Sequence, residues 1–255
     1  MQTRNNTILI TGGGSGIGRA LAEAFHGRGN RVVIAGRRKA VLDGVTAANP
    51  GMEAALLDIE DASAIRPFAE RLVADYPTLN VILHSAGIMR AEALRDGALD
   101  DAEAIIATNL LGPIRLTAAL LPHLLAQPQA AIVTVSSGLA FMPRASTPTY
   151  NATKAAIHSY TQSLRYQLQD TPVHVLEIIP PYVQTELMGA AQANDPTAMP
   201  LHDFIDEVMG IITTSPDANE IIVERVKPLR FAEENGNYDT FFKRFNGRMQ
   251  ARSHD

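Results

Sequence analysis

Two side chains in the middle of the chain have the types and spacing that acid–base chemistry requires. Tyr150 and Lys154, in the stretch YNATK, stand four residues apart, and a helix would place them on one face. A free phenol titrates near pH ~10, and a cation within roughly 4–6 Å favours the phenolate and lowers that pKa. We therefore expect Lys154 to tune Tyr150 for proton transfer at neutral pH. The alternative is a surface pair on an amphipathic helix.

A pair of hydroxyls follows an apolar run at a position where ligands bind. Ser136 and Ser137 come directly after Ala131–Val135, and the carboxyl ends of strands in open parallel sheets hold ligands. A hydroxyl there can hold a carbonyl oxygen as an oxyanion donor. A nucleophilic role is not indicated, because the chain shows neither GxSxG nor a suitably placed histidine. Ser137 is the candidate, and the alternative is that both serines only form a turn.

A glycine-rich loop, TGGGSGIG, runs from Thr11 to Gly18, between a short apolar run and a helical pattern. Residues without a Cβ let backbone N–H groups approach a pyrophosphate, and a helix N-terminus favours its negative charge. The spacing departs from the GxGxxG of the common dinucleotide fingerprint, and a plain tight turn is the alternative. The candidate cofactor-binding residues of this loop are Gly12, Gly14, Ser15, Gly16, Ile17 and Gly18.

The residues after the second strand-like run indicate which dinucleotide binds. An acid there accepts the ribose hydroxyls of NAD, whereas arginine accommodates the extra phosphate of NADP. Here Arg37, Arg38 and Lys39 follow Gly36, and no acid appears before Asp43. Arg37 is the best candidate, because a guanidinium binds phosphate through two parallel hydrogen bonds. We expect NADP(H) to be preferred over NAD(H); the alternative is a solvated start of a helix.

Strand-like and helix-like segments alternate along the chain, which predicts a single α/β domain over residues 1–255. The strand-like runs are 7–11, 31–36, 53–58, 80–84, 131–135 and 173–179, and the helix-like segments are 16–28, 38–47, 62–76, 99–125 and 149–169. This order predicts a doubly wound, Rossmann-like parallel sheet with helices on both faces. Six strands are expected, whereas a seventh near residue 220 is not visible. Residues 203–212 and 216–234 read as helices, the second capped by Ser215 and kinked or split at Pro228.

Composition limits the classes of partner. The 255 residues carry a net charge of -5 without a basic stripe, contain no cysteine, and include no run of eighteen apolar residues. We therefore expect no nucleic-acid partner, no membrane span and no metal site, and a cytoplasmic location.

Asn109 lies inside the long helical segment, four residues before Pro113. Proline has no N–H, so the carbonyl of Asn109 loses its helical partner and the helix should be distorted there. The freed carbonyl can hold a water molecule, and a solvent-facing kink without function is the alternative.

Together these motifs resemble the extended-core short-chain dehydrogenase/reductase family, from Thr7 to about Thr185. The resemblance implies that Tyr150 donates or accepts the proton, that Lys154 tunes it and holds the nicotinamide ribose, and that Ser137 orients the carbonyl. It also implies that Asn109 keeps a water molecule linking Lys154 to solvent and that Asp58 contacts the adenine. Further cofactor-binding positions implied by the resemblance are Ile59, Ala86, Gly87, Pro180, Val183 and Thr185.

The chain departs from the family pattern at three places. His84-Ser85-Ala86-Gly87 stands where the family usually reads NNAG, and Pro180-Pro181 stands in place of Pro-Gly. We expect His84 to be structural, with contact to cofactor or substrate as the alternative. The third departure is the helical reading after residue 215, which with the ending YDTFFKRFN resembles a bacterial subgroup, the DltE-like oxidoreductases.

The irregular segment 185–215 is predicted to be a substrate lid, with a packed surface helix as the alternative. An uncharged or hydrophobic ketone or aldehyde is expected rather than a sugar phosphate, and Arg144 is the residue that does not fit this expectation. The candidate substrate residues are Phe141, Met142, Tyr182, Leu187 and Met188. In the helical C-terminal segment 216–255, an aromatic cluster at helical spacing is expected to pack against the core or a second subunit, and a homodimer or homotetramer is predicted. That cluster comprises Tyr238, Phe241, Phe242 and Phe245.

The expected function is an NADPH-dependent carbonyl reductase that works reversibly as an alcohol dehydrogenase. The alternatives are an NAD-dependent alcohol dehydrogenase, a dinucleotide sensor that does no chemistry, and isomerase or dehydratase chemistry on the same scaffold.

Overall fold

A seven-stranded parallel sheet forms the centre of the molecule, described by a computed structural model for residues 1–252. The strands are β1 (Thr7–Thr11), β2 (Arg31–Gly36), β3 (Glu53–Leu56), β4 (Leu79–His84), β5 (Ala130–Val135), β6 (Val173–Ile179) and β7 (Glu220–Ile222). Their order is β3-β2-β1-β4-β5-β6-β7, so the winding direction reverses between β1 and β4. Ligands of such sheets bind at the carboxyl ends of the strands on either side of this reversal. The predicted doubly wound α/β fold is confirmed.

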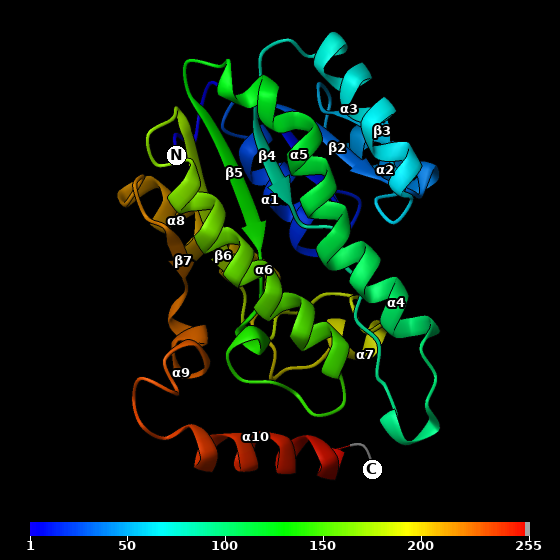
Figure 1. Ribbon diagram of the computed structural model, residues 1–255, viewed down its shortest axis with the longest axis vertical. Coiled ribbons are helices and arrows are strands. Elements are labelled where there is room, and N and C mark those ends of the chain that lie inside the picture. The colour runs from blue at the N-terminus through cyan, green and yellow to red at the C-terminus, as the bar shows by residue number, and fades with distance from the viewer. Residues whose placement is uncertain (253–255) are drawn as a thin grey trace.

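Helices cover both faces of the sheet, which explains why its strands are apolar on both sides. The helices that follow the first three strands are α1 (Gly16–His26), α2 (Lys39–Ala48) and α3 (Ala62–Asp75). One face packs against α1, α2 and α8 (Leu201–Thr214), with Phe25 and Phe204 fully buried there. The other face packs against α3, α5 (Gly112–Leu125) and α6 (Pro148–Gln167). In Figure 1, α5 and α6 cross in front of the central strands.

The reading of residues 216–234 as a helix is wrong. Ser215 ends α8, with its N–H bonded to the Ile211 carbonyl, and β7 pairs in parallel with β6 through Glu220–Ile222. A residue before proline is disfavoured in the helical region, so Pro216 stops the preceding helix. A strand of three residues is also too short to show a period in the sequence. Pro228 lies in the first turn of the short α9 (Lys227–Arg230), where proline is tolerated.

The predicted distortion at Asn109 is confirmed. The long helix consists of α4 (Asp100–Ile106), a π-helical turn (Ala107–Leu111) and α5, and the N–H of Gly112 bonds to the carbonyl of Ala107. The wider turn includes Asn109, whose carbonyl has no α-helical donor because residue 113 is proline. By length and composition Asp100–Leu125 could cross a membrane, but its Leu116 is fully buried against the sheet, as in a core helix.

The segment after β6 divides into two parts. Residues 184–200 are irregular apart from the short α7 (Ala190–Ala193) and a bridge between Val183 and Met199. By contrast, α8 contacts α1 and buries Phe204 in the core. A lid over all of 185–215 is therefore wrong, because its second half is a core helix. Only the part up to residue 200 lies outside a core helix, and its role as a lid stays a prediction.

The chain ends in α10 (Tyr238–Arg252), which lies across one end of the molecule (Figure 1). Asn246 ties it to the loop after β5, since its side chain accepts from the N–H of Ala145 and donates to the carbonyl of Pro143. The predicted aromatic cluster forms two stacked pairs on α10, Tyr238 with Phe242 and Phe241 with Phe245.

Candidate active site

A cleft of about 430 Å³ opens at the carboxyl ends of the central strands, on both sides of the reversal in winding. Its size is within the usual range for sites that hold small molecules and cofactors. The structure brings together most of the predicted site residues along this cleft. They are Gly12, Gly14, Ser15, Gly16, Ile17, Gly18, Arg37, Arg38, Asp58, Ile59, Ala86, Gly87, Ser137, Tyr150, Lys154, Pro180, Val183, Thr185 and Leu187.

Tyr150, Ser137 and Lys154 meet inside the cleft, and all three are buried. Helix α6 presents Tyr150 and Lys154 one turn apart, and Ser137 follows the end of β5. The Tyr150 hydroxyl shares a hydrogen bond with Ser137, whose Oγ also accepts from the N–H of Leu139 at 3.1 Å. The Lys154 Nζ lies 5.5 Å from the centre of the Tyr150 ring and donates to the Val135 carbonyl at 2.8 Å.

Burial is the main cause of the pKa shifts of Tyr150 and Lys154. For Tyr150 the shift is upward, opposite to the lowering that was expected from Lys154. Loss of solvation raises the pKa of the Tyr150 phenol to about 12, and the hydrogen bond from Ser137 offsets only part of that rise. Burial also lowers the pKa of Lys154 to about 8, against the opposing charge of Glu177. The sequence prediction counted the cation and not the desolvation that accompanies it. At neutral pH Tyr150 is therefore a protonated phenol, ready to give up a proton rather than to take one.

Asn109 stands behind the cleft rather than on its lining. Its Oδ1 accepts from the N–H of Ile88 at 2.9 Å, and its Nδ2 donates to the Ile88 carbonyl at 2.9 Å and to Thr153 Oγ1 at 3.3 Å. The side chain thus ties the irregular segment after β4 to the π-turn and to α6. The predicted water link to Lys154 would run through the Asn109 carbonyl in the π-turn, and it stays a prediction.

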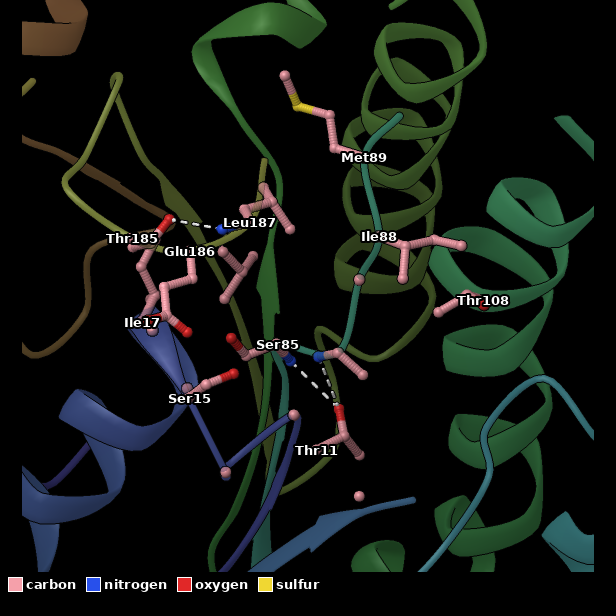
Figure 2. A pocket seen from close by; sticks show the side chains of 18 of the residues that line it. Thr11, Ser15, Ile17, Ser85, Ile88, Met89, Thr108, Thr185, Glu186 and Leu187 are labelled. Atoms are coloured by element: carbon pink, nitrogen blue, oxygen red, sulfur yellow. Dashed lines mark hydrogen bonds between the residues drawn. The ribbon is translucent and has the colours of Figure 1, made fainter. Parts of the chain in front are cut away.

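At Gly12 the glycine loop packs so closely against the residues that follow β4 that it leaves no room for a side chain. Gly12 has φ +69°, and a Cβ there would lie 2.7 Å from the Cα of Ala86. Thr11 locks the same junction, since its Oγ1 accepts from the N–H groups of Ser85 and Ala86 at 3.2 Å each (Figure 2). In the same view, Ser15, Ile17 and Glu186 lie on one side of the cleft, while Ile88 and Thr108 lie on the other. The result is a cradle of bare backbone at a helix N-terminus, which fits a pyrophosphate.

The cations after β2 stand at the open end of this cradle. Lys39 forms an ion pair with Asp43 within α2, at 2.7 Å. Of the charged groups that the structure describes, no carboxylate lies within ion-pair distance of Arg37 or Arg38; Arg38 donates to Ser15 Oγ at 3.4 Å. Both arginines line the cleft with Asp58. The donor set therefore fits a dinucleotide with an extra phosphate, and Arg37 and Arg38 would hold that phosphate.

Four of the five predicted substrate residues do not line the cleft: Phe141, Met142, Tyr182 and Met188. The Phe141 ring packs edge-on against His158 at 4.7 Å, and Met142 is fully buried. Met188 contacts the Arg144 guanidinium through its sulfur at 3.6 Å. The short helical turn Gly138–Ala140 after Ser137 explains part of this difference, since it carries the residues that follow it into the core.

His84 is structural, as expected. It is buried at the carboxyl end of β4, where its Nε2 bonds to Thr117 Oγ1 of α5 at 2.9 Å. Burial lowers its pKa to about 4. It does not line the cleft.

Sequence reasoning missed several residues that line the cleft. They are Thr11, Val41, Leu57, Ser85, Ile88, Met89, Arg90, Thr108, Ser136, Pro181, Glu186 and Gln192, together with Ala35, Gly36, Leu42 and Val135. Thr11 and Ser85 stand next to residues of recognised motifs, and this adjacency was the signal that could have identified them as cleft residues. Met89 lies in an irregular segment and Gln192 in the four-residue α7, which is too short to show a pattern.

Comparison with known proteins agrees with this geometry. The family model described as short chain dehydrogenase matches residues 6–196. An oxidoreductase of Bacillus subtilis (strain 168), named DltE and described as uncharacterized, is 38% identical, with 96% of this chain and 98% of that protein covered. Among solved structures, a short-chain dehydrogenase from Streptomyces avermitilis has a TM-score of 0.81 at 23% identity, covering 98% of this chain and 100% of that one.

A second solved structure is the closed form of a serine dehydrogenase complexed with NADP+. It is 26% identical, with a TM-score of 0.76, and 84% of this chain and 92% of that chain are covered. The match to the family model over three quarters of the chain, and the 38% identity to a relative along nearly its whole length, show that this chain belongs to the short-chain dehydrogenase family of oxidoreductases.

Proposed function

We propose that this protein is an NADP(H)-dependent oxidoreductase that interconverts a ketone or aldehyde and its alcohol. The observation that carries the proposal is the buried group of Tyr150, Ser137 and Lys154, which stands at the end of the sheet beside the glycine cradle. A phenol, a hydroxyl and an ammonium in one cleft are the groups that carbonyl reduction requires from a protein.

Each of the three side chains has a separate task in the reduction. A bound nicotinamide cofactor supplies the hydride for the carbonyl carbon. Tyr150 holds a proton at its hydroxyl and delivers it to the carbonyl oxygen, because burial keeps its pKa at about 12. Ser137 orients the same oxygen by hydrogen bonding. The Lys154 ammonium stabilises the negative charge that remains on the Tyr150 oxygen after the proton leaves.

The substrate that we propose is uncharged and mostly apolar. Ile88, Met89 and Leu187 supply apolar side chains to the cleft, and Leu187 belongs to the irregular segment 184–200 that can close over a ligand. A panel of aliphatic and aromatic ketones, aldehydes and alcohols, assayed with both cofactors by the absorbance of reduced nicotinamide, tests this proposal. Turnover of carbonyls with NADPH supports it. Absence of turnover across the panel, with the cofactor bound, would favour a dinucleotide sensor.

Arg37→Ala tests the cofactor preference. The variant should weaken NADPH binding by on the order of 1.5 to 3 kcal/mol, roughly 10- to 150-fold, because a charged hydrogen bond to the extra phosphate is lost. NADH binding should hardly change. The preference for NADP(H) is also consistent with the NADP+ bound to the serine dehydrogenase that is 26% identical.

Lys39→Ala is the matched control, since Lys39 also carries a positive charge at this turn but pairs with Asp43. Both dinucleotides should bind this variant as they bind the wild type, in titrations followed by nicotinamide fluorescence. If Arg37→Ala weakened the binding of NADPH and NADH equally, Arg37 would not be the residue that recognises the extra phosphate.

We further propose a homodimer or homotetramer in the cytoplasm. Apolar side chains stand exposed on the long helices, among them Ile106 and Leu111 around the π-turn and Tyr166 near the end of α6. Surfaces of this kind are often covered by a second copy. Light scattering coupled to size-exclusion chromatography should give a multiple of 27.5 kDa, and a monomer across the accessible concentration range would refute the assembly.

A further inference from the structure

A row of polar side chains runs across the apolar sheet, from the carboxyl ends of β1 and β4 to the amino end of β7. The register joins them as neighbours on successive strands from β1 to β7: Thr11, His84, Thr134, Glu177 and Glu220. In-register neighbours point to the same face of a sheet, so the whole row faces α5 and α6. Glu177 is fully buried, and it is the only acidic side chain among the buried residues of the described chain. Because an isolated buried carboxylate is costly, its partners define its role.

His158 holds Glu177 from α6. Its Nδ1 lies 2.8 Å from one carboxylate oxygen and 3.1 Å from the other. His158 follows Lys154 by four residues, as Lys154 follows Tyr150, so the three side chains share one face of α6. The edge-on contact with Phe141 fixes the ring of His158 from the other side.

Lys154 is the only lysine or arginine among the buried residues of the described chain. Its Nζ donates to the carbonyl of Val135, and Val135 pairs across the sheet with Ile178, the residue after Glu177. The negative charge of Glu177 favours the ammonium form of Lys154, against the burial that lowers the pKa of Lys154 to about 8. Without Glu177, desolvation would act on Lys154 unopposed.

A metal ion is the other reading of this cluster, since one ligand atom each from His158, Glu177 and Glu220 lie within 4.8 Å of one another. The guanidinium of Arg230 argues against it. Its Nε and Nη2 donate to the two carboxylate oxygens of Glu220, at 3.0 and 3.3 Å. A fixed cation in this position repels a divalent ion and already neutralises Glu220. The charge of Glu177 then acts on two cations of α6, Lys154 and Arg165.

We propose that Glu177, held by His158, is a positioning residue that keeps Lys154 in its charged form at the pH at which the enzyme works. The role of Lys154 in catalysis rests on the proposed function, but its charge can be measured without any substrate. The charged and titratable groups around this pair are Tyr150, Lys154, His158 and Arg165 on α6, Glu177 on β6, Glu220 on β7 and Arg230 on α9.

Lysine NMR gives the direct test, because the chain contains only four lysines: Lys39, Lys154, Lys227 and Lys243. With ¹³Cε-labelled lysine, each gives one signal, and Lys154→Arg assigns the buried one. In the wild type this signal should titrate near pH 8, where the ammonium is present below the midpoint and lost above it. In Glu177→Gln the midpoint should move down by about one pH unit, because the opposing charge is gone while an amide still bonds His158.

Glu220→Gln is the matched control, the same change one strand further along the row, and it should leave the Lys154 midpoint within about 0.2 units, given the Arg230 that already neutralises Glu220. A midpoint in Glu177→Gln equal to that of the wild type would overturn the proposal. So would a wild-type Lys154 that is already neutral at pH ~6, a result that does not depend on the variant folding.

The activity profile provides a second readout once a substrate is known. The kcat/KM for reduction should fall as pH rises through the Lys154 midpoint, and this fall should begin about one pH unit earlier in Glu177→Gln than in the wild type. A purely structural role would lower the activity equally at every pH. If no carbonyl turns over, the proposed function fails while the NMR result still decides the role of Glu177.

Discussion

Tyr150→Phe is expected to lower kcat/KM for carbonyl reduction by about 10²- to 10⁴-fold, the usual contribution of a general acid. The variant loses only the hydroxyl that carries the proton. Burial raises the pKa of this phenol to about 12, so at neutral pH the wild type has its proton in place and the variant has none. Cofactor affinity should stay within a few-fold, because the glycine cradle and Arg37 are untouched. Steady-state kinetics and a fluorescence titration with NADPH measure the two effects separately.

The change should leave the fold intact. The Tyr150 ring is 6% exposed, and phenylalanine fills the same space. Ser137 Oγ keeps its bond from the N–H of Leu139 when the phenol is removed. Tyr166→Phe is the matched control, since this tyrosine is on the same helix but 74% exposed, and its variant should match the wild type. Turnover by Tyr150→Phe within a few-fold of the wild type would mean that another group donates the proton.

The sequence predicted the fold well where elements are long and periodic. The alternation of strands and helices up to residue 179 predicted a doubly wound parallel sheet, and the Asn109–Pro113 spacing predicted the helix distortion where the π-turn lies. β7 escaped prediction because three residues, Glu220–Ile222, cannot display a period. What defines that strand is its pairing with β6, an interaction between segments more than forty residues apart.

The site, like the fold, was predictable from the sequence only in part. Tyr150, Ser137, Lys154 and the glycine loop were predictable because local spacing and strand ends place them. Of the predicted substrate residues only Leu187 lines the cleft. Phe141 does not, because it packs on His158, and no local pattern encodes how close that residue of α6 comes to the loop. The pKa values were also out of reach. They depend on how deeply Tyr150 and Lys154 are buried, which the whole fold decides.

The row of polar residues that includes Glu177 shows a further limit. In the sequence, Glu177 is a lone acid within an apolar strand, and Thr134 is one β-branched residue among several. Only the register makes Thr134 and Glu177 neighbours, and only the packing of α6 on the sheet brings His158 to the carboxylate. Charges that act through the sheet are therefore found from the structure and not from motifs.

Gly12→Ala is expected to lower the free energy of unfolding by about 2 to 5 kcal/mol. Gly12 has φ +69°, a conformation that costs alanine roughly 1–2 kcal/mol. The added Cβ would also lie 2.7 and 2.8 Å from the Cα and N of Ala86, and overpacking of this kind costs about 1–3 kcal/mol. The backbone of Ala86 cannot move away freely, because its N–H bonds to Thr11 Oγ1. Denaturant unfolding followed by circular dichroism measures the loss.

The same substitution should also weaken dinucleotide binding, because relief of the clash moves the loop away from the end of β4 and opens the cradle. Gly44→Ala is the matched control: Gly44 lies inside α2, has no heavy atom within 4 Å of the added Cβ, and is not in the left-handed region. That variant should be more stable than the wild type by about 0.5–1 kcal/mol, as for alanine replacing glycine within a helix. A Gly12→Ala protein as stable as the wild type, with unchanged NADPH affinity, would show that the close contact between the glycine loop and β4 does not shape the cofactor site.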